Sequence, residues 1–438
     1  MQSSRLLLRF LTVGGLALLL LLPLSMIRGT IHERQGYRTQ AVERVAQSMA
    51  GPQRLVGPLR VVPWTETRSI DYVDAQGRAK SEQKTERGYL LQVPRSLQID
   101  GKLVPDTRRI GLHEVRVFEW RARLRANFED QPLPVLPGRV YAAPYLVLGV
   151  ADVRGLLGMP QLRVDGRAAR LQPGTRELAA RFGGVHVMLP AAAGRVTAGR
   201  EVALDFVLAG TESLAVAPVG DDNRIAIDSS WPHPLFGGRF LPRTRTVTAR
   251  GFNARWDVSS LASAAQTQLR DGAAESKDLD SLQVSLVDPV NVYTQTDRAS
   301  KYGILFVLLT FVGFALFELI KQLPIHPLQY LLVGLALAIF FLLLLSLSEH
   351  IAFWQAYLLS AAACIGLQGV YLSHVLRSRA RGLGFAAMLT ALYAVLYGLL
   401  VAEDNALLMG SLLLFGVLAT VMWITRKLDW YELGTSLR

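Results

Sequence analysis

Two short acidic pairs, Glu349-His350 and Glu403-Asp404, are the residues of this sequence best suited to proton transfer or cation binding. Each pair separates two long apolar segments, so we expect both on turns of a helical bundle. Ionisable groups beside such a bundle could bind a cation, relay protons, or anchor a neighbouring domain through Asp297, Arg298 and Lys301. Carboxylates in a hydrated turn carry no desolvation cost, however. The competing interpretation is therefore that these residues only satisfy the membrane topology of a short loop and have no direct function.

A second candidate site is the string WPHPLFGG at residues 231–238. Its prolines and glycines predict an irregular loop in which Trp231 and Phe236 offer large apolar surfaces beside His233. Rigid aromatic side chains make effective contacts with partners or ligands, so this loop is a candidate binding surface. The alternative is an ordered corner whose aromatic rings plug the adjoining sheet.

Familiar catalytic and metal-binding patterns are missing from the sequence. It contains no Walker phosphate loop, no Gly-x-Ser-x-Gly elbow and no His-Glu-x-x-His motif. The histidines are scattered, and the single cysteine, Cys364, excludes an intrachain disulfide and a cysteine-based metal site. We therefore expect no cofactor, no bound metal and a function that is not enzymatic.

The net charge of +12 at pH 7 is one that nucleic-acid-binding proteins also carry. The basic residues are, however, spread along the chain or placed beside apolar segments, as membrane topology requires. A hydrophobic content of 51% and a mean hydropathy of +0.27 fit a chain that is part soluble and part membrane-embedded. We expect a lipid bilayer, and no nucleic acid, as a partner.

Six apolar segments of the sequence are long enough to cross a bilayer. The first, residues 10–27, lacks a small-x-small cleavage site and predicts an uncleaved anchor rather than a signal peptide, with a kink at Pro23 near its outer end. The others are residues 302–319, 328–347, 351–372, 383–401 and 406–425. The predicted domains are an N-terminus with its anchor (1–27), a large intervening domain (28–301), a five-helix transmembrane bundle (302–425) and a tail (426–438).

The charges of the short connections predict the orientation of the bundle. Lys321, residues 377–381 and residues 426–427 place Lys or Arg on one side, whereas the acidic pairs place none on the other. Short loops rich in Lys and Arg stay in the cytoplasm, so we expect both termini there and the intervening domain outside. Arg28, Arg34 and Arg38 depart from this pattern, but long translocated domains largely escape the rule.

The intervening domain is predicted to be mainly antiparallel β, either sandwich-like or built from two packed β subdomains. Apolar residues alternate along 118–128, 202–208 and 282–286, as in strands with one buried face. Asp100-Gly101 and Asp165-Gly166 are expected to form tight hairpin turns. Residues 28–50 lack the alternation, and the helical spacing of their apolar residues predicts a helical lead-in.

Several specific strings occur along almost the whole chain: GPQRLVGP (51–58), WPHP (231–234), DRASKY (297–302), HPLQYLLVG (326–334), LSLSEH (345–350), EDNALL (403–408) and DWY (429–431). With these strings in this order, the sequence resembles the CreD family of Gram-negative inner-membrane proteins. The resemblance implies an inner-membrane protein with a periplasmic β domain and a role in cell-envelope integrity and stress response, within a two-component regulon. It implies no catalytic residue and no cofactor.

We therefore expect a scaffold or binding protein that acts through its periplasmic β domain. Its partner would be a periplasmic or inner-membrane protein or an envelope component, and a positively charged domain favours anionic partners. The alternative is a transporter or membrane enzyme that uses Glu349, His350, Glu403 and Asp404.

Overall fold

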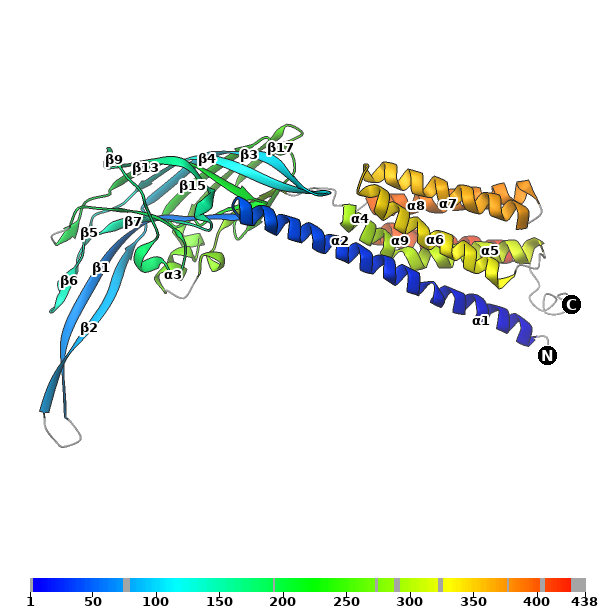
Figure 1. Cartoon of the computed structure of the whole chain (residues 1–438), viewed down its shortest axis with the longest axis horizontal. Coiled ribbons are helices and arrows are strands. Elements are labelled where there is room, and N and C mark those ends of the chain that lie inside the picture. Colours follow the sequence, from blue (N-terminus) through cyan, green and yellow to red (C-terminus); the bar gives the residue numbers. More distant parts are fainter. Residues whose placement is uncertain are drawn as a thin grey trace. The chain divides into compact units, whose positions relative to one another are not determined.

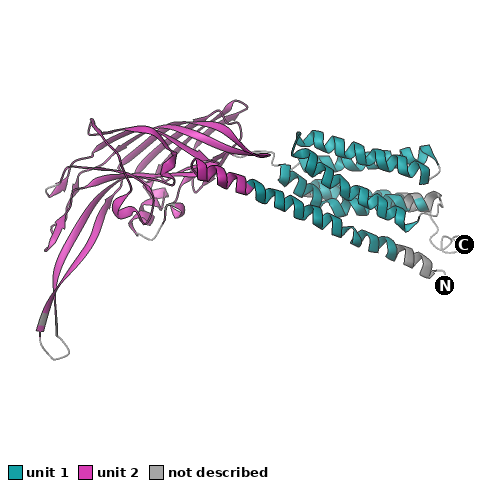
Figure 2. Ribbon diagram, viewed as in Figure 1, with its two compact units in different colours: residues 1–38, 290–438 teal, residues 39–289 magenta. Residues whose placement is uncertain are grey.

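The chain folds into two compact units in a computed structural model that describes residues 3–73, 79–191, 194–271, 275–286, 292–321, 326–375, 378–401 and 406–426 (Figures 1 and 2). The membrane unit comprises residues 1–38 and 290–438. The β unit comprises residues 39–289. Each unit has its own hydrophobic core.

The membrane unit consists of apolar helices and one short amphipathic helix, α4 (Val292–Lys301). In the described part of the chain these are α1 (Ser3–Leu19), the first part of α2 (Leu21–Ser48), α4, α5 (Gly303–Lys321), α6 (Pro327–Ser348), α7 (Phe353–Val375), α8 (Arg379–Val401) and α9 (Ala406–Thr425). These elements confirm that, along the chain, an N-terminal apolar helix precedes a β domain and a set of apolar helices follows it.

The number of membrane-crossing helices was predicted to be six. Among the described residues, four helical segments are long and apolar enough to cross a membrane: Leu11–Ser48, α6, α7 and α8. The pair α4 and α5, bent by 44°, makes up to five if it is counted as one span. In α9 the apolar helix Leu408–Trp423 is shorter than these, so the count of six stays a prediction.

The first two helices are separated only at Leu20. Proline has no amide hydrogen and its ring crowds the carbonyl four residues earlier, so Pro23 removes the helical bond to Leu19. The helical assignment is accordingly interrupted at Leu20, while the kink expected at Pro23 stays a prediction, because Leu11–Ser48 counts as one continuous helical segment. From Leu21 the helix α2 continues to Ser48, and its last residues, from Thr39, belong to the β unit.

Two large sheets and a small one make up the described β unit. The nine-stranded sheet has the order β10 (Gln172–Pro173), β11 (Gly184–Met188), β7 (Tyr145–Val150), β1 (Gln53–Val73), β14 (Ser213–Val216), β19 (Leu282–Leu286) and β16 (Pro234–Gly238), with β2 (Ala79–Gln92) and β6 (Arg139–Tyr141) also paired to β1. The eight-stranded sheet has the order β17 (Thr244–Thr248), β18 (Gly251–Ser259), β15 (Asp222–Ser229), β3 (Ser96–Ile110), β4 (His113–Asn127), β13 (Glu201–Thr211), β8 (Leu156–Val164) and β9 (Arg167–Ala169). Strands β5 (Gln131–Pro132) and β12 (Arg195–Val196) form the third sheet.

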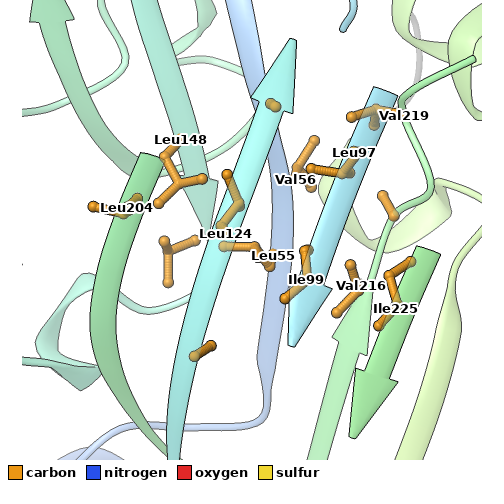
Figure 3. Packing of buried hydrophobic residues seen from close by; sticks show 14 of the residues in the cluster. Leu55, Val56, Leu97, Ile99, Leu124, Leu148, Leu204, Val216, Val219 and Ile225 are labelled. Atoms are coloured by element: carbon orange, nitrogen blue, oxygen red, sulfur yellow. The ribbon is translucent and has the colours of Figure 1, made fainter. Parts of the chain in front are cut away.

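The two large sheets share one hydrophobic core, as in a sandwich. Figure 3 shows Leu55, Val56 and Leu148 of the nine-stranded sheet close to Ile99 and Leu124 of the eight-stranded sheet. Along β4, buried apolar residues alternate with exposed polar ones, which confirms the predicted period of two. Pairing between the described strands is antiparallel except for β1 with β14 and β3 with β15.

The two predicted hairpin turns have different outcomes. Asp165 and Gly166 form a tight turn between β8 and β9, and both have the positive φ values, 49° and 75°, that two-residue hairpins require. Asp100-Gly101, by contrast, lies inside β3, so the turn predicted there is wrong. A Cβ atom at Gly101 would lie 2.3 Å from Nε1 of Trp120, so the glycine makes room for this buried indole ring.

Candidate functional site

An ion-pair cluster lies where α2, α4 and the end of α6 meet in the membrane unit. Two carboxylates, Asp297 and Glu349, are surrounded there by three cations and a tyrosine hydroxyl. We use the name ion-pair cluster for Arg28, Arg34, Tyr293, Asp297, Lys301 and Glu349.

The sequence of α4 places three members of the cluster on one face. Tyr293, Asp297 and Lys301 are spaced by four residues, the spacing at which helical side chains are neighbours. The Lys301 ammonium lies 2.9 Å from the Asp297 carboxylate, and the Arg28 Nε donates to the other oxygen of Asp297 at 3.2 Å. Asp297 is therefore bound by one cation of its own helix and one of α2.

Glu349 depends on partners from two other helices. It is the residue that follows the last turn of α6, where the negative end of the helix dipole disfavours a further negative charge. Its side chain is only 8% exposed. The Tyr293 hydroxyl donates to it at 3.2 Å, and the Arg34 guanidinium lies 3.7 Å away. These partners offset both the desolvation and the dipole, so Glu349 is held in one place.

The cluster also accounts for two residues that depart from the charge pattern of the sequence. Arg28 and Arg34 carry positive charge where the topology rule disfavours it, and each is paired with a carboxylate of the bundle. Both carboxylates are occupied by cations of the protein itself. Within the described residues, no group of three or more His, Cys, Asp or Glu side chains is arranged to hold a metal ion.

The residues of the two predicted acidic pairs are placed differently. Glu349 belongs to the ion-pair cluster, whereas the neighbouring His350 is exposed and has only its backbone amide bonded, to Leu347 O at 3.0 Å. The described structure therefore does not bring the Glu349 and His350 side chains together into one site. Glu403 and Asp404 lie outside the described residues.

The predicted aromatic loop is a loop only in its first part. Residues 231–233 are irregular, but Pro234–Gly238 form β16, which pairs with β19 at the edge of the nine-stranded sheet. The prediction of an irregular loop through Gly238 is therefore wrong. An edge strand accepts proline at its first position because no ladder bond from that residue is needed, so Pro234 begins the strand rather than preventing it.

The aromatic rings of this segment pack within the β unit. Phe236 makes edge contacts with Phe252 and Trp256, at centroid distances of 5.5 and 5.9 Å. Trp231 is half-buried, its Nε1 donates to His233 O at 2.9 Å, and the Arg116 guanidinium lies 5.0 Å from its ring centroid. The His233 side chain is exposed. A partner-binding role for Trp231, His233 and Phe236 stays a prediction.

Sequence reasoning missed a buried polar face in the bundle. We call it the α7 polar face; its members are Tyr357, Ser360, Cys364 and Gln368, each no more than 5% exposed. Tyr357 donates to Tyr393 O at 2.7 Å, and the Cys364 thiol lies 3.5 Å from Ala336 O. The signal in the sequence is a set of polar residues that recur every three or four positions in an apolar segment. A pattern of charged residues does not reveal this face, because none of its members carries a charge.

Several buried polar atoms of the membrane unit, including some on this face, lack partners among the described residues. Ser360 Oγ and both amide atoms of Gln368 have no hydrogen bond among the described residues. The same holds for the Tyr393 hydroxyl and for Thr310 Oγ1, on α8 and α5. Unpaired polar groups are expensive in a bilayer core, where no bulk water can bind them. The α7 polar face is therefore a second candidate site within the membrane unit.

Comparison with known proteins identifies the family. The sequence profile of inner membrane protein CreD matches residues 5–431. The chain belongs to the CreD family. Inner membrane protein CreD of Escherichia coli (strain K12) is 36% identical over 434 residues, which cover 98% of this chain and 95% of that relative. The CreD resemblance of the sequence strings is thus confirmed, and the chain is a multi-pass protein of an inner-membrane family.

The comparison with solved structures gives no information on the function of this chain. An M1 zinc metallopeptidase from Deinococcus radiodurans overlaps 44% of this chain and 42% of its own, with 12% identity and a TM-score of 0.23. A TM-score this low supports neither a common fold nor a common activity.

Two of the strings that carry the CreD resemblance have clear structural roles. His326 caps α6: its Nδ1 accepts the Leu328 amide at 3.2 Å, and Gln329 Oε1 accepts the His326 amide at 3.1 Å. Gly57 lies at a bulge of β1 with φ +108°, where a Cβ atom would lie 2.8 Å from Val147 O. Glycine is therefore required at this point of the strand.

Proposed function

We propose that this CreD-family protein is a non-enzymatic scaffold or binding protein that presents its β domain in the periplasm and supports cell-envelope integrity under stress. The ion-pair cluster carries this proposal. Arg28 and Arg34 of α2 are tied to Asp297 of α4 and to Glu349. Helices α2 and α4 precede and follow the β domain in the sequence, so the cluster joins the two helices that flank this domain in the chain. Carboxylates that are already paired with cations of the protein are better suited to a structural role than to catalysis.

The proposed orientation, with the β domain in the periplasm and both termini in the cytoplasm, is supported by charge. In the sequence, Lys321 and the arginines at 377–381 and 426 flank the apolar segments at the ends that this orientation assigns to the cytoplasm. Arg28 and Arg34 no longer count against this orientation, because each is paired with a carboxylate.

Single cysteines can test this orientation in intact cells. Ser81 is exposed on β2, and Ser378 lies between α7 and α8. With a membrane-impermeant maleimide applied to spheroplasts, Ser81→Cys should be labelled at once and Ser378→Cys only after permeabilisation. The wild-type chain is the control, because its single cysteine, Cys364, is buried. The reverse labelling pattern would overturn the proposed orientation.

The envelope role can be tested by complementation. A strain lacking the protein should leak a periplasmic reporter enzyme under membrane-perturbing stress, and the wild-type gene should restore retention. Arg34→Gln should restore it only partly, because Glu349 is then left buried with a weaker partner. Arg87→Gln, on the exposed part of β2, is the matched control and should restore it fully. Unchanged leakage in the strain lacking the protein would contradict the role.

Partner binding through the aromatic segment needs its own experiment. The full-length protein in nanodiscs can be incubated with solubilised envelope fractions, comparing wild type with Trp231→Ala and His233→Ala. His233→Ala is the sharper variant, since its side chain is exposed while Trp231 also packs within the domain. We expect His233→Ala to lose a specific bound component; identical sets of bound components would exclude this segment as the binding surface.

A second candidate function, transport or membrane-embedded catalysis, is favoured by one observation. The α7 polar face carries unpaired polar atoms at Ser360 and Gln368 inside the bundle. A transport pathway would use such groups, whereas a scaffold has no need of them. Gln368→Leu should abolish complementation while leaving membrane insertion intact if this function holds. Full complementation by Gln368→Leu would favour the scaffold.

A further inference from the structure

The strands β1 and β2 extend beyond the rest of the nine-stranded sheet as a two-stranded ribbon. Strand β1 pairs with β6 only over Trp64–Glu66. In the part of the chain that the structure describes, residues 68–73 of β1 pair with residues 79–84 of β2 and with no further strand. We call these two segments the ribbon, and Figure 1 shows it projecting from the β unit.

The outer edge of β2 is open to another strand. Strand β2 pairs with β1 and with no other strand that the structure describes. Residues 81–87 are all exposed, so the backbone N–H and C=O groups that point away from β1 face solvent. An isolated two-stranded ribbon is marginally stable in water, and such an edge is a template for pairing with another chain. The side chains of β2 indicate which strand fits there.

Charges of opposite sign alternate along one face of β2. Glu82, Lys84 and Glu86 are spaced by two residues, so they share a face of the strand. The residues of β1 directly opposite them do not carry complementary charge, because the pairs are Ile70–Glu82, Arg68–Lys84 and Glu66–Glu86. Like charges directly opposite one another do not stabilise a strand pair. Pairing with β1 therefore does not explain the charge pattern of β2.

Contacts along β2 itself do not explain the pattern either. The Lys84 ammonium lies 3.4 Å from the Glu86 carboxylate, but these side chains are 61% and 52% exposed. An ion pair between two exposed side chains contributes little to stability. The alternating charges are thus available to a strand that pairs with the outer edge.

The sequence of β2 is complementary to its own reverse. When two β2 strands pair antiparallel about Gln83, this residue lies opposite Gln83 of the second copy. Glu82 of each copy then lies opposite Lys84 of the other, and Ser81 lies opposite Thr85. Opposite charges and pairs of hydroxyl side chains are both favourable across an antiparallel strand pair.

The alternation of sign distinguishes this pattern from ordinary protection of an edge. Charged side chains on an edge strand commonly prevent association, and a run of one sign would repel a second copy. On β2 the signs alternate, and the sequence continues the alternation with Lys80 and Glu86, which the same register sets opposite each other. The charged positions between residues 80 and 86 therefore all favour a second copy in this register.

We propose that the outer edge of β2 is a homodimer interface, in which two copies of this chain pair their β2 strands antiparallel about Gln83. Backbone hydrogen bonds along residues 79–87 supply the attraction, as in other cases of strand addition to a sheet edge. The two symmetric pairs of Glu82 with Lys84 fix the register. This interface is a further property of the β unit, which the proposed scaffold role does not require.

Oxidative cross-linking of the full-length protein in native membranes tests the interface. Because Gln83 lies on the twofold axis, the two residues of Gln83→Cys have Cα atoms about 4.5–5.5 Å apart, within the range of a disulfide. We expect a covalent dimer of Gln83→Cys on a non-reducing gel. Wild type reports any cross-linking through the buried Cys364.

Ser69→Cys is the matched control for collisions between ribbons. Ser69 is exposed and lies opposite Gln83 on β1 of the same ribbon. In the proposed dimer the two Ser69 residues are three strand spacings apart, about 14 Å, which is too far for a disulfide. We therefore expect little cross-linking of Ser69→Cys under conditions that cross-link Gln83→Cys.

Charge reversal tests the register. In the Gln83→Cys chain, Glu82→Lys alone or Lys84→Glu alone sets like charges opposite each other and should lower the rate of cross-linking at least about fivefold. Arg224→Glu, at an exposed arginine of the eight-stranded sheet, is the matched control and should leave the rate unchanged.

Mixing the two reversed chains separates pairing between copies from folding of the ribbon. When the Glu82→Lys chain and the Lys84→Glu chain are produced together, two lysines of one copy lie opposite two glutamates of the other. The cross-link should then return between unlike chains, and two distinguishable tags identify this mixed dimer. A defect in the folding of either ribbon could not be restored by the other chain.

Equal cross-linking of Gln83→Cys and Ser69→Cys would overturn the proposal. Absence of the mixed dimer would overturn it too, as would a cross-link from Gln83→Cys to a different protein in place of a second copy. Each of these outcomes leaves the envelope role untouched, because that role is decided by the complementation experiment.

Discussion

Arg60 in the β unit and Gln368 in the membrane unit are both buried polar side chains, 0% and 2% exposed, yet their bonding capacity is used in opposite ways. Arg60 donates to Gln92 Oε1, to Ala198 O at 2.9 Å and to Glu129 O. Gln368 has no partner among the described residues for either amide atom. Arg60 therefore contributes hydrogen bonds to the fold of the β unit, whereas the Gln368 amide contributes none to the bundle.

The environment of Arg60 explains why a charge is tolerated there. Burial lowers its pKa to about 10, and the nearby carboxylates of Asp130 and Asp165 oppose the shift. The group therefore stays charged at neutral pH. The Phe128 ring lies 5.2 Å from the guanidinium carbon and adds a cation–π contact. Every direct acceptor is neutral, and the loss of Arg60 would leave Gln92 Oε1 and Ala198 O without this donor.

Arg60→Met should therefore give the largest effect on stability. Two acceptor oxygens, Gln92 Oε1 and Ala198 O, would lose their donor, whereas Glu129 O keeps the bond from Gln92 Nε2. Each buried acceptor left without a donor typically costs about 1–3 kcal/mol. The loss of β-sheet circular dichroism in a denaturant titration of the detergent-solubilised full chain would measure it. Arg87→Met, at an exposed position of β2, is the control and should change stability by less than about 0.5 kcal/mol. A cost below about 1 kcal/mol for Arg60→Met would mean that these bonds contribute little.

Gln368→Leu should act with the opposite sign and a smaller size. Replacing an unpaired buried amide by an apolar group of similar volume removes a desolvation penalty and should be neutral or stabilising by about 1 kcal/mol. Helical circular dichroism during titration with a denaturing detergent would measure it. Gln355→Leu, exposed on the same helix, is the matched control. Clear destabilisation by Gln368→Leu would show that the amide finds a partner in the membrane and would remove the contrast with Arg60.

The sequence could predict features that depend on local pattern. The alternation along 118–128 is that of β4, and the apolar runs after residue 302 are helices, because burial on one face or in lipid leaves a periodic trace. Family membership followed from strings such as HPLQYLLVG, part of which caps α6.

Features that depend on distant partners could not be predicted in this way. Gly101 has the local chemistry of a turn but serves the indole ring of Trp120 on the next strand. Arg34 and Glu349 are far apart in the sequence and meet only in the folded unit. The α7 polar face was detectable by spacing but carries no charge. The acceptors of Arg60 come from Gln92, Glu129 and Ala198, which no local pattern connects.

The smallest expected effect is a pH dependence that belongs to the same Arg60 environment. Arg200 donates through Nε to Asp130 Oδ1 at 2.6 Å, and this bond lowers the pKa of the Asp130 carboxyl. The folded pKa thus lies below the unfolded value of about 3.9, so the pair stabilises the fold above about pH 4 and this contribution is lost as pH falls through the folded pKa. Arg200→Gln should flatten the stability profile below about pH 4, and Arg224→Gln should preserve it in this region. Parallel profiles for Arg200→Gln and wild type would show that the Asp130 charge is stabilised chiefly by other groups, of which Arg195, 3.9 Å away, is the first and Arg60 the next.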